Sequence, residues 1–376
     1  MYRACFGKHF SDLEDTRYPG FVEHKLVDIL ILVMCGTLSG LDEPEDIVEY
    51  GKAKKEELQA LFAIEQIPSL STLTRVLNMV DGEEVASRVI HIMCELLGTD
   101  GDVVPVDGKT ICSTAKEGSA RETLHIVTAY LTSNGVTLGQ LTVSEKTNEI
   151  PIVRDLLDMI DIEGKIVTAD AMHCQKDTAE KILERGGDYV IGLKGNQPLM
   201  HDEIKMYLED CVADPKIEVE TVRTQEKNGG RIETRTCYKA PSLDWFESKD
   251  EWAGLTSAFM VHRRVVIKDK TTEETAFYIT SLDALAEKLL ALSREHWKIE
   301  SMHWMLDVVF SEDDCRILSP NGQKTMNVFR KFALAMHKNY IASLPQKTKP
   351  SIKKHILRTL LSPSLLTNII SSFTVS

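Results

Sequence analysis

The order of short apolar runs after residue 102 restricts the fold of this chain more than any other feature of its sequence. Three strand-like runs rich in β-branched residues come first, and a Ser-Asn-Gly turn joins the last two. Two more strands follow, each reached through an amphipathic helix, and another helix comes after them. The strands are predicted at Val103–Val106, Leu124–Leu131, Val136–Val143, Lys165–Thr168 and Asp188–Leu193, and the crossover helices at Ile152–Ile160 and Lys176–Arg185. This order predicts an α/β fold with a mixed five-stranded sheet and helices on its faces.

The other segments flank or interrupt this pattern, which has the strand order of the ribonuclease-H-like fold. Alternating stretches between residues 215 and 280 predict a β-rich insertion, after which helical spacing resumes from Ala284 to about Met305 and over roughly Gln323–Tyr340. The predicted parts are a helical domain at 1–98, the first part of the α/β domain at 99–214, the insertion at 215–281, the rest of the α/β domain at 282–340 and a basic tail at 341–376.

The first hundred residues are predicted to form the small helical domain, because apolar residues recur at helical spacing between residues 21 and 97. The apolar run Ile29–Leu38 is too short to cross ~30 Å of hydrocarbon and is interpreted as a buried helix. The segment after Pro68 could be a recognition helix with Arg75 facing outward. The acidic surroundings favour a plain packing helix instead.

The formal net charge of −13 argues against a protein that coats nucleic acid non-specifically. The charge is segregated, however, because residues 315–376 carry ten Lys and Arg and no acidic residue. This basic end could lie along a phosphate backbone, or it could be a solvated cationic helix face. The cations concerned are Arg330, Lys331, Lys338, Lys353, Lys354 and Arg358.

The sequence has no secretory signal and no cysteine spacing typical of a zinc site. Its eight cysteines contain no C-x-x-C pair, so reduced and mainly buried thiols are expected. Without a signal-like segment or a span long enough for a membrane, the expected location is the cytoplasm and no membrane contact is expected.

Two carboxylates are predicted at the rim of the sheet. Asp107 and Asp170 each follow an apolar strand, and the connection order makes those strands neighbours. Glu300 is a third acid, on the helix after the insertion. Three such oxygen donors would suit Mg²⁺ or Mn²⁺. The alternatives are that Asp107-Gly108 is only a turn and Asp170 only a helix cap, and the 57 acidic residues include other candidates for the third position. These are Glu295, Asp307, Glu312, Asp313 and Asp314.

Ordered sequence blocks run along nearly the whole chain. They are Phe10-Ser-Asp-Leu, His24-Lys-Leu-Val-Asp-Ile-Leu, Ile67-Pro-Ser, Val106-Asp-Gly-Lys-Thr, His125-Ile-Val-Thr-Ala, Leu138-Gly-Gln, Glu145-Lys-Thr-Asn-Glu-Ile, Val167-Thr-Ala-Asp-Ala, Tyr189-Val-Ile-Gly-Leu-Lys-Gly-Asn-Gln, Gly230-Arg-Ile-Glu-Thr-Arg and His296-Trp-Lys-Ile-Glu-Ser. In these blocks the chain resembles the ISAs-type insertion-sequence transposases, also called H-repeat-associated proteins, within the DDE transposases. The resemblance implies a catalytic and metal-binding triad of Asp107, Asp170 and Glu300.

The sequence departs from the family pattern at several positions. Ser301 replaces the usual Asn after the glutamate, and Gly229-Gly230-Arg231 lacks the His that commonly precedes Gly-Arg. Of the tyrosine, arginine, glutamate and lysine signature of DDE enzymes, Arg294 and His296 lie near the expected arginine, and Asp307 stands where a lysine is expected. Neither of the first two departures concerns a metal ligand, so altered DNA contacts are expected more than lost chemistry.

The candidates for DNA contact are polar residues near the predicted triad. They are Lys109, Lys194, Asn196, Gln197, Arg231, Arg235, Arg294 and His296. Arg231 and Arg235 share one face of a strand, where they could equally keep an exposed edge soluble. His173 could contact a metal-bound water or be a satisfied core histidine. Trp297 and Trp304 are seven residues apart on one helix, a spacing that usually indicates core packing.

The function expected from the resemblance is that of a DNA transposase. It would bind terminal inverted repeats and target DNA, use two Mg²⁺ or Mn²⁺ ions for phosphodiester hydrolysis and 3′-hydroxyl strand transfer, and act as a homodimer or larger assembly. The alternatives are a catalytically inactive or domesticated DNA-binding protein, a nuclease or junction resolvase that cuts without joining, and a metal-free structural protein.

Overall fold

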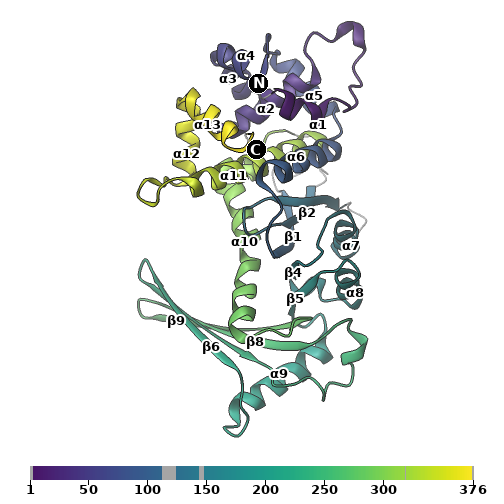
Figure 1. Cartoon of the computed structure of the whole chain (residues 1–376), viewed down its shortest axis with the longest axis vertical. Coiled ribbons are helices and arrows are strands. Elements are labelled where there is room, and N and C mark those ends of the chain that lie inside the picture. Colours follow the sequence, from purple (N-terminus) through teal and green to yellow (C-terminus); the bar gives the residue numbers. More distant parts are fainter. Residues whose placement is uncertain (1–2, 112–123, 144–147, 318, 375–376) are drawn as a thin grey trace, which may run out of the picture. The chain divides into compact units, whose positions relative to one another are not determined.

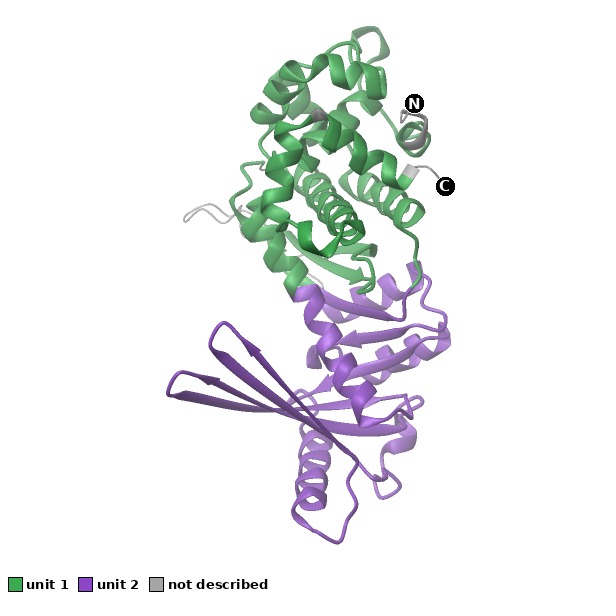
Figure 2. Cartoon of the chain, turned by 60° about the vertical axis from the view of Figure 1, so that its left-hand side comes forward, with its two compact units in different colours: residues 1–100, 108–147, 301–376 green, residues 101–107, 148–300 purple. Residues whose placement is uncertain are grey.

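The structure is a computed structural model that describes residues 3–111, 124–143, 148–317 and 319–374. Two compact units divide the chain (Figure 2). Unit 1 comprises residues 1–100, 108–147 and 301–376, and unit 2 comprises residues 101–107 and 148–300. The five-part division expected from the sequence stays a prediction. Part of the Glu145 block lies outside the described residues, as does Cys112.

The strands form one hydrogen-bonded sheet of nine, in the order β3-β2-β1-β4-β5-β9-β8-β7-β6 (Figure 1). They are β1 (Val103–Ile111), β2 (Leu124–Tyr130), β3 (Thr137–Val143), β4 (Ile166–Ala169), β5 (Asp188–Leu193), β6 (Thr221–Asn228), β7 (Arg231–Lys239), β8 (Ser257–Ile267) and β9 (Lys270–Thr280). The α/β class is confirmed, whereas the five-stranded count is wrong. The strands expected as an insertion extend the same sheet, because β9 pairs antiparallel with β5.

Unit 2 has helices on both sides of its strands. Helices α7 (Glu149–Met159), α8 (Lys176–Glu184) and α9 (Pro198–Ala213) connect them, and the first part of α10 (Ala286–Phe310) packs on the sheet. The side chains in this packing alternate along their strands, so one face is apolar and buried. Their cluster comprises Ile166, Val190, Cys237, Phe259, Val261, Ala286, Leu289, Leu290 and Leu292. This packing fixes α10 against β4 and β5, the strands that lead into the predicted site.

Unit 1 is built around helix α11 (Pro320–Ser343), which contacts α2, α5, α6, α12 and α13. The other helices are α1 (Arg3–Phe10), α2 (Leu26–Leu38), α3 (Pro44–Ala53), α4 (Lys55–Phe62), α5 (Leu70–Met79), α6 (Gly82–Leu97), α12 (Ile352–Leu361) and α13 (Pro363–Thr374). The interpretation of Ile29–Leu38 as a buried helix is confirmed, because its side chains are almost entirely inaccessible. Within the described part of the chain, no helix is both long and apolar enough to span a membrane.

The basic C-terminal end differs from the expected cationic surface. Arg330 and Lys331 are 1% and 4% exposed on α11 and therefore cannot lie along a phosphate backbone. The Lys331 ammonium donates to Thr128 Oγ1 and Gln140 Oε1 at 2.8 and 2.9 Å, and burial lowers its pKa to about 7. Residues 341–376 include the helices α12 and α13, and Lys353, Lys354 and Arg358 are exposed on α12, as the alternative of a solvated cationic helix face predicts.

Helix α12 packs closely on the turn between α2 and α3. Gly40 has φ +81°, and a Cβ atom there would lie 2.4 Å from Ile356 Cγ2. We expect Gly40→Ala to lower the free energy of unfolding of unit 1 by about 1–3 kcal/mol, because the left-handed backbone conformation and the clash both oppose a side chain. Urea denaturation followed by circular dichroism measures this difference.

Gly98→Ala is the matched control for this change. Gly98 also has a left-handed φ of +75°, but no described atom lies within 4 Å of the added Cβ. It therefore carries the backbone cost without the clash. Equal destabilisation by the two substitutions would contradict the packing of α12 against this turn.

Candidate active site

The parallel pairing of β1 with β4 brings two acidic residues to neighbouring strands. Val106 is the register partner of Ala169, so Asp107 and Asp170 follow the same pair of the ladder. The sequence predicted that Asp107 stands at the end of its strand. This is wrong, because β1 continues through Gly108 to Ile111. The alternative reading of Asp107-Gly108 as a turn is therefore wrong, and only the pairing with β4 ends at Val106.

Asp170 lies between β4 and a short 3-10 helix, Ala171–His173. Although it occupies the N-cap position, its side chain makes no capping hydrogen bond to that helix. Its Oδ1 lies 3.4 Å from Nε2 of His296, and His296 Nδ1 lies 3.2 Å from Thr168 Oγ1. The imidazole lowers the pKa of the Asp170 carboxyl. Asp170 therefore remains an ionised, largely exposed carboxylate that His296 helps to orient.

Glu300 follows His296 by four residues on α10 and therefore projects from the same helix face. Burial raises the pKa of Glu300, the His296 ring opposes that rise, and the negative charges of Asp107 and Asp170 raise it further. Asp170 and Glu300 also line the same hollow, and the charge of Asp107 acts on Glu300 from the neighbouring strand. All three belong to unit 2.

A hollow of about 70 Å³ lies between α10, the C-terminal ends of β4 and β5 and the middle of β9. Asp170, Glu300, His296 and Lys194 line its polar side, and Tyr278 and Trp297 are among its aromatic walls. Burial, with a further contribution from Asp170, raises the pKa of Tyr278 to about 12, so its hydroxyl stays protonated at neutral pH.

The chemistry of this donor set fits a hard divalent cation. Carboxylate oxygens are the ligands that Mg²⁺ and Mn²⁺ prefer, and a cation would relieve the repulsion that raises the pKa of Glu300. Among the residues that the structure describes, however, no three His, Cys, Asp or Glu side chains are gathered closely enough to form a metal-binding group. The residues for a cation site are therefore near one another without forming a ligand cluster.

Three of the competing acids take part in ion pairs elsewhere. Glu295 accepts from Lys298 at 2.7 Å, while Asp307 and Glu312 both contact the ammonium of Lys109. The Lys109 side chain is only 13% exposed. The ammonium group that was predicted to contact DNA therefore takes part in an internal ion pair. Asp307, which replaces an expected lysine, thus has a lysine as its partner.

The loop after Asp170 is held by residues that were predicted to contact DNA. Asn196 Nδ2 donates to the carbonyl of Ala171 at 2.5 Å, and Gln197 Nε2 donates to the carbonyl of Cys174 at 2.9 Å. His173 is fully buried, with Nε2 3.0 Å from Glu149 Oε1, and so is not directed at a metal-bound water. These side chains position Asp170, while the exposed Lys194 lines the hollow itself.

The hydrogen bond from Gln197 gives a testable consequence for this loop. We expect Gln197→Ala to speed amide hydrogen exchange in residues 171–175 by about 2- to 12-fold, because one hydrogen bond contributes about 0.5–1.5 kcal/mol. Exchange measured by mass spectrometry on the whole chain tests this. Gln225→Ala, whose amide donates to Thr234 on β7, is a remote control that should leave the loop unchanged. Equal effects of both substitutions would contradict the bracing role.

Several other residues lie differently from expectation. Trp297 and Trp304 are 53% and 60% exposed, so the prediction of core packing is wrong for both. Arg231, Arg235 and Arg294 line a second cavity together with Arg263, which the sequence reasoning missed. The alternating residues of β8 could have identified Arg263, since antiparallel pairing with β7 places it opposite Arg235.

Two protein-family models match this chain, and each covers a different part of it. The family described as "Transposase DDE domain" matches residues 98–336, and the family described as "DDE_Tnp_1-associated" matches residues 7–92. A similar protein is "H repeat-associated putative transposase YhhI" of Escherichia coli (strain K12), which is 34% identical with 90% of this chain and 96% of the relative covered. "Putative transposase YncI" of Escherichia coli O157:H7 is also 34% identical, with 87% and 85% covered.

A solved structure also aligns with the chain. The piggyBac transposase synaptic complex with hairpin DNA covers 99% of this chain and 78% of its own chain, with a TM-score of 0.41 and 11% identity.

Proposed function

This chain belongs to the transposases with a DDE domain, and on that premise we propose that it binds the terminal inverted repeats of its own insertion element and hydrolyses the phosphodiester bond at each 3′ end. The liberated 3′-hydroxyl then attacks target DNA without a covalent protein–DNA intermediate. Because two element ends are processed together, a homodimer or larger assembly forms. Strands β1 to β5 are the ribonuclease-H-like core of this enzyme.

The observation that carries the proposal is the placement of three interacting carboxylates in one part of unit 2. The β1–β4 register brings Asp107 beside Asp170, and both carboxylates raise the pKa of Glu300. In the proposed site these three side chains hold the divalent cations, with two Mg²⁺ or Mn²⁺ ions expected. When bound, the ions supply Lewis-acid stabilisation of the charge that develops in an in-line phosphoryl displacement.

Neighbouring side chains prepare this site for DNA. His296 Nδ1 lies 3.2 Å from Thr168 Oγ1, and its Nε2 lies 3.4 Å from Asp170 Oδ1, so the ring, when protonated, places a positive charge beside this carboxylate. The Lys194 ammonium lines the hollow and favours ionised carboxylates there, because it lowers the pKa of both Asp170 and Glu300. The pKa of Glu300 is nevertheless raised overall, because burial outweighs Lys194 there. Lys194 also provides a positive charge beside the position where the scissile phosphate would lie.

The experiment that tests the proposal uses a labelled duplex that carries the element's own terminal repeat. Incubation with Mg²⁺ should give cleavage at the 3′ end of the repeat, and addition of a target duplex should give joined products. A chelator should abolish both, and a duplex with a scrambled repeat is the control for specificity.

The products distinguish the proposal from its alternatives. Cut but never joined DNA would indicate a nuclease on the same fold. Specific binding without any cleavage would indicate a DNA-binding protein that has lost catalysis. Neither binding nor cleavage would contradict the proposed function altogether.

A further inference from the structure

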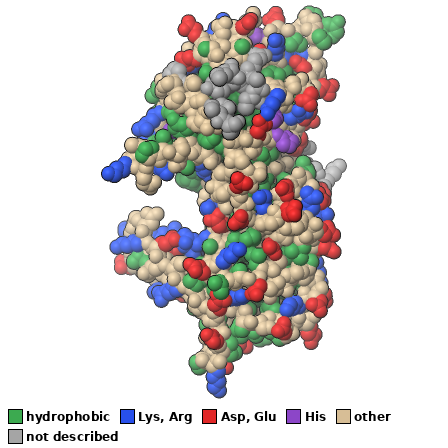
Figure 3. All heavy atoms as spheres, viewed as in Figure 1, with side chains coloured by type: hydrophobic (Ala, Val, Ile, Leu, Met, Phe, Trp, Pro, Cys, Tyr) green, Lys and Arg blue, Asp and Glu red, His purple; other side chains and the backbone are tan. Residues whose placement is uncertain are grey.

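A second cavity, of about 340 Å³, lies on the face of β7, β8 and β9 beside α10. Four guanidinium groups and a single carboxylate, that of Glu274, line it. We refer to it as the arginine cavity, and its four cations are Arg231, Arg235, Arg263 and Arg294. Figure 3 shows Lys and Arg side chains gathered over these strands.

The strand register explains why the arginines converge. Arg231, Glu233 and Arg235 alternate along β7 and so share one face, and Arg235 lies opposite Arg263 in the pairing with β8. Where Cys237 and Val261 continue this face, apolar side chains pack under α10. The same face is therefore apolar beneath the helix and cationic beyond it.

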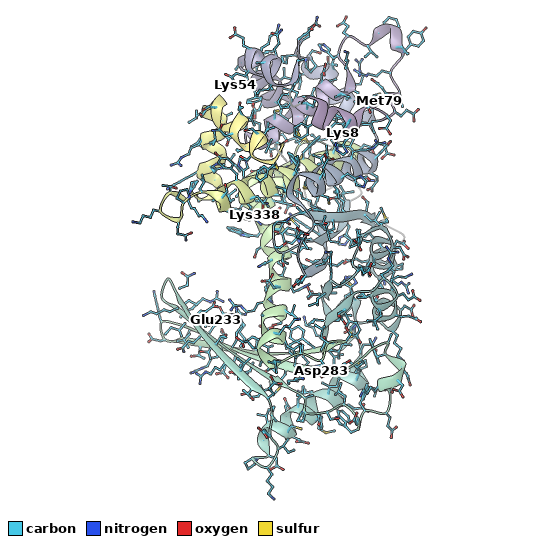
Figure 4. All side chains as sticks on the ribbon, in the orientation of Figure 1. Lys8, Lys54, Met79, Glu233, Asp283 and Lys338 are labelled. Atoms are coloured by element: carbon cyan, nitrogen blue, oxygen red, sulfur yellow. The ribbon has the colours of Figure 1, made fainter. Side chains whose placement is uncertain are left out.

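Glu233, labelled in Figure 4, contacts three of these arginines. Its carboxylate is 8% exposed, accepts from Arg231 at 2.5 Å and from Arg263 at 2.6 Å, and contacts Arg235. Although burial opposes ionisation, the arginines lower the pKa of Glu233. Glu274 also pairs with Arg263 at 3.5 Å, and Glu226 pairs with Arg294 at 2.6 Å. Three carboxylates therefore face four guanidinium groups, which leaves one positive charge.

Hydrogen-bonding capacity also remains in the cavity. Arg231 Nε and Arg235 Nη1 are buried and make no hydrogen bond to any described residue. Arg235 Nη1 lies 3.8 Å from a carboxylate oxygen of Glu226, beyond hydrogen-bond distance. A buried donor without an acceptor costs about 1–3 kcal/mol, so these nitrogens favour an added ligand. A guanidinium fork matches the oxygens of a phosphate group.

The arginine cavity adjoins the hollow that Asp170 and Glu300 line. Glu274, Ala276, Tyr278, Ser293 and Trp297 line both spaces, so one wall separates the arginines from Asp170 and Glu300. A cavity of about 340 Å³ cannot enclose a duplex, whose major groove alone admits a whole α-helix. A single phosphodiester group with its sugar fits a cavity of this size.

We infer that the arginine cavity binds one backbone phosphate of the DNA strand beside the cleaved bond, and that Glu233 is the positioning residue that sets its guanidinium groups. The inference rests on the proposed function and names a DNA contact of that same site. The phosphate lies on the far side of the Trp297 wall from the carboxylates, so the cavity fixes the strand without taking part in the chemistry.

The first test measures binding of the terminal-repeat duplex at several salt concentrations without divalent cation, by fluorescence anisotropy. Arg235→Gln should weaken binding at least about tenfold, since charge-assisted hydrogen bonds are lost. It should also reduce the slope of log affinity against log salt by about 0.9, the value for one phosphate contact. Arg264→Gln is the matched control. Arg264 follows Arg263 on β8, but it pairs with Glu273 and lies outside the cavity.

Glu233→Gln separates positioning from bulk charge. The substitution makes the protein more positive, so charge alone would strengthen DNA binding. If Glu233 sets the arginines, affinity should instead fall by about threefold or more, while circular dichroism stays unchanged. Tighter binding by Glu233→Gln would overturn the positioning role.

A second measurement changes the DNA, one phosphate at a time. Single methylphosphonate groups remove one phosphate charge at a time from the repeat duplex. One position beside the cleavage site should weaken wild-type binding and should have no further effect on Arg235→Gln. Additive losses at every position would overturn the inference. Inorganic phosphate is a competitor in the same assay, and a cavity that takes phosphate while Arg235→Gln leaves DNA binding unchanged would be a free-anion site instead.

The outcomes also separate this inference from the proposed function. If the wild-type protein fails to bind the repeat duplex at all, both are contradicted. If it binds and cleaves while Arg235→Gln behaves like Arg264→Gln, only the arginine cavity loses its assignment.

Discussion

Glu300→Gln should abolish DNA cleavage, with a loss of at least about 10³-fold in rate and little change in affinity for the repeat duplex. The amide keeps the shape of the side chain but removes the negative oxygen donor that a divalent cation requires. A loss of this size corresponds to about 4 kcal/mol of transition-state stabilisation, within the range expected when a metal site is disabled. Single-turnover cleavage of the labelled duplex in Mg²⁺ measures it.

A readout other than activity tests the same residue. Mg²⁺ should raise the melting temperature of the wild-type protein and should have a smaller effect on Glu300→Gln, since a ligand stabilises only the state that binds it. Glu295→Gln is the control, because Glu295 lies on the same helix, pairs with Lys298 and does not line the hollow. Cleavage by Glu300→Gln within tenfold of the wild type would contradict the assignment.

Glu312→Ala should lower the free energy of unfolding of unit 1 by about 3–5 kcal/mol, because it leaves buried cations without their partner. Glu312 is fully buried, with Oε2 3.0 Å from Lys109 and Oε1 2.9 Å from the Asn327 amide. Arg330, 1% exposed, lies 3.9 Å away. Urea denaturation of the variant against the wild type gives the difference.

We also expect the contribution of Glu312 to the free energy of unfolding to depend on pH. Burial opposes ionisation of Glu312, but Lys109 and Arg330 outweigh it and lower the pKa. A lowered pKa in the folded state adds stability above the unfolded value of about 4.3, and this stability is lost as pH falls through the folded pKa. The difference between wild type and Glu312→Gln should therefore shrink below about pH 4.

Asp314→Ala is the control for this pair of measurements. Asp314 lies two residues further on in the same short 3-10 helix and is exposed, so its removal should change stability by less than about 0.5 kcal/mol. A change of that size for Glu312→Ala as well would show that the buried ion pairs contribute nothing.

The three carboxylates of the proposed site were predictable to different degrees. The element order predicted that the strands of Asp107 and Asp170 are neighbours, because the first three strands form a meander and the helix after them returns the chain to the free edge of β1. The register confirms this pairing. Glu300 was one acid among 57, and only the family resemblance singled it out. Its proximity to the other two is a property of the packing of α10 on the sheet.

The sequence by itself determined the elements of this protein, and the tertiary structure decided their surroundings. Hydrophobic periodicity is local, so it located the strands, the helices and the buried helix α2. Which neighbour a strand pairs with depends on contacts between residues far apart in the sequence. The periodicity therefore did not predict that β9 would pair with β5 and extend the expected five-stranded sheet. For the same reason a charged pair such as Arg330 and Lys331 became core residues, because helices from both ends of the chain surround α11.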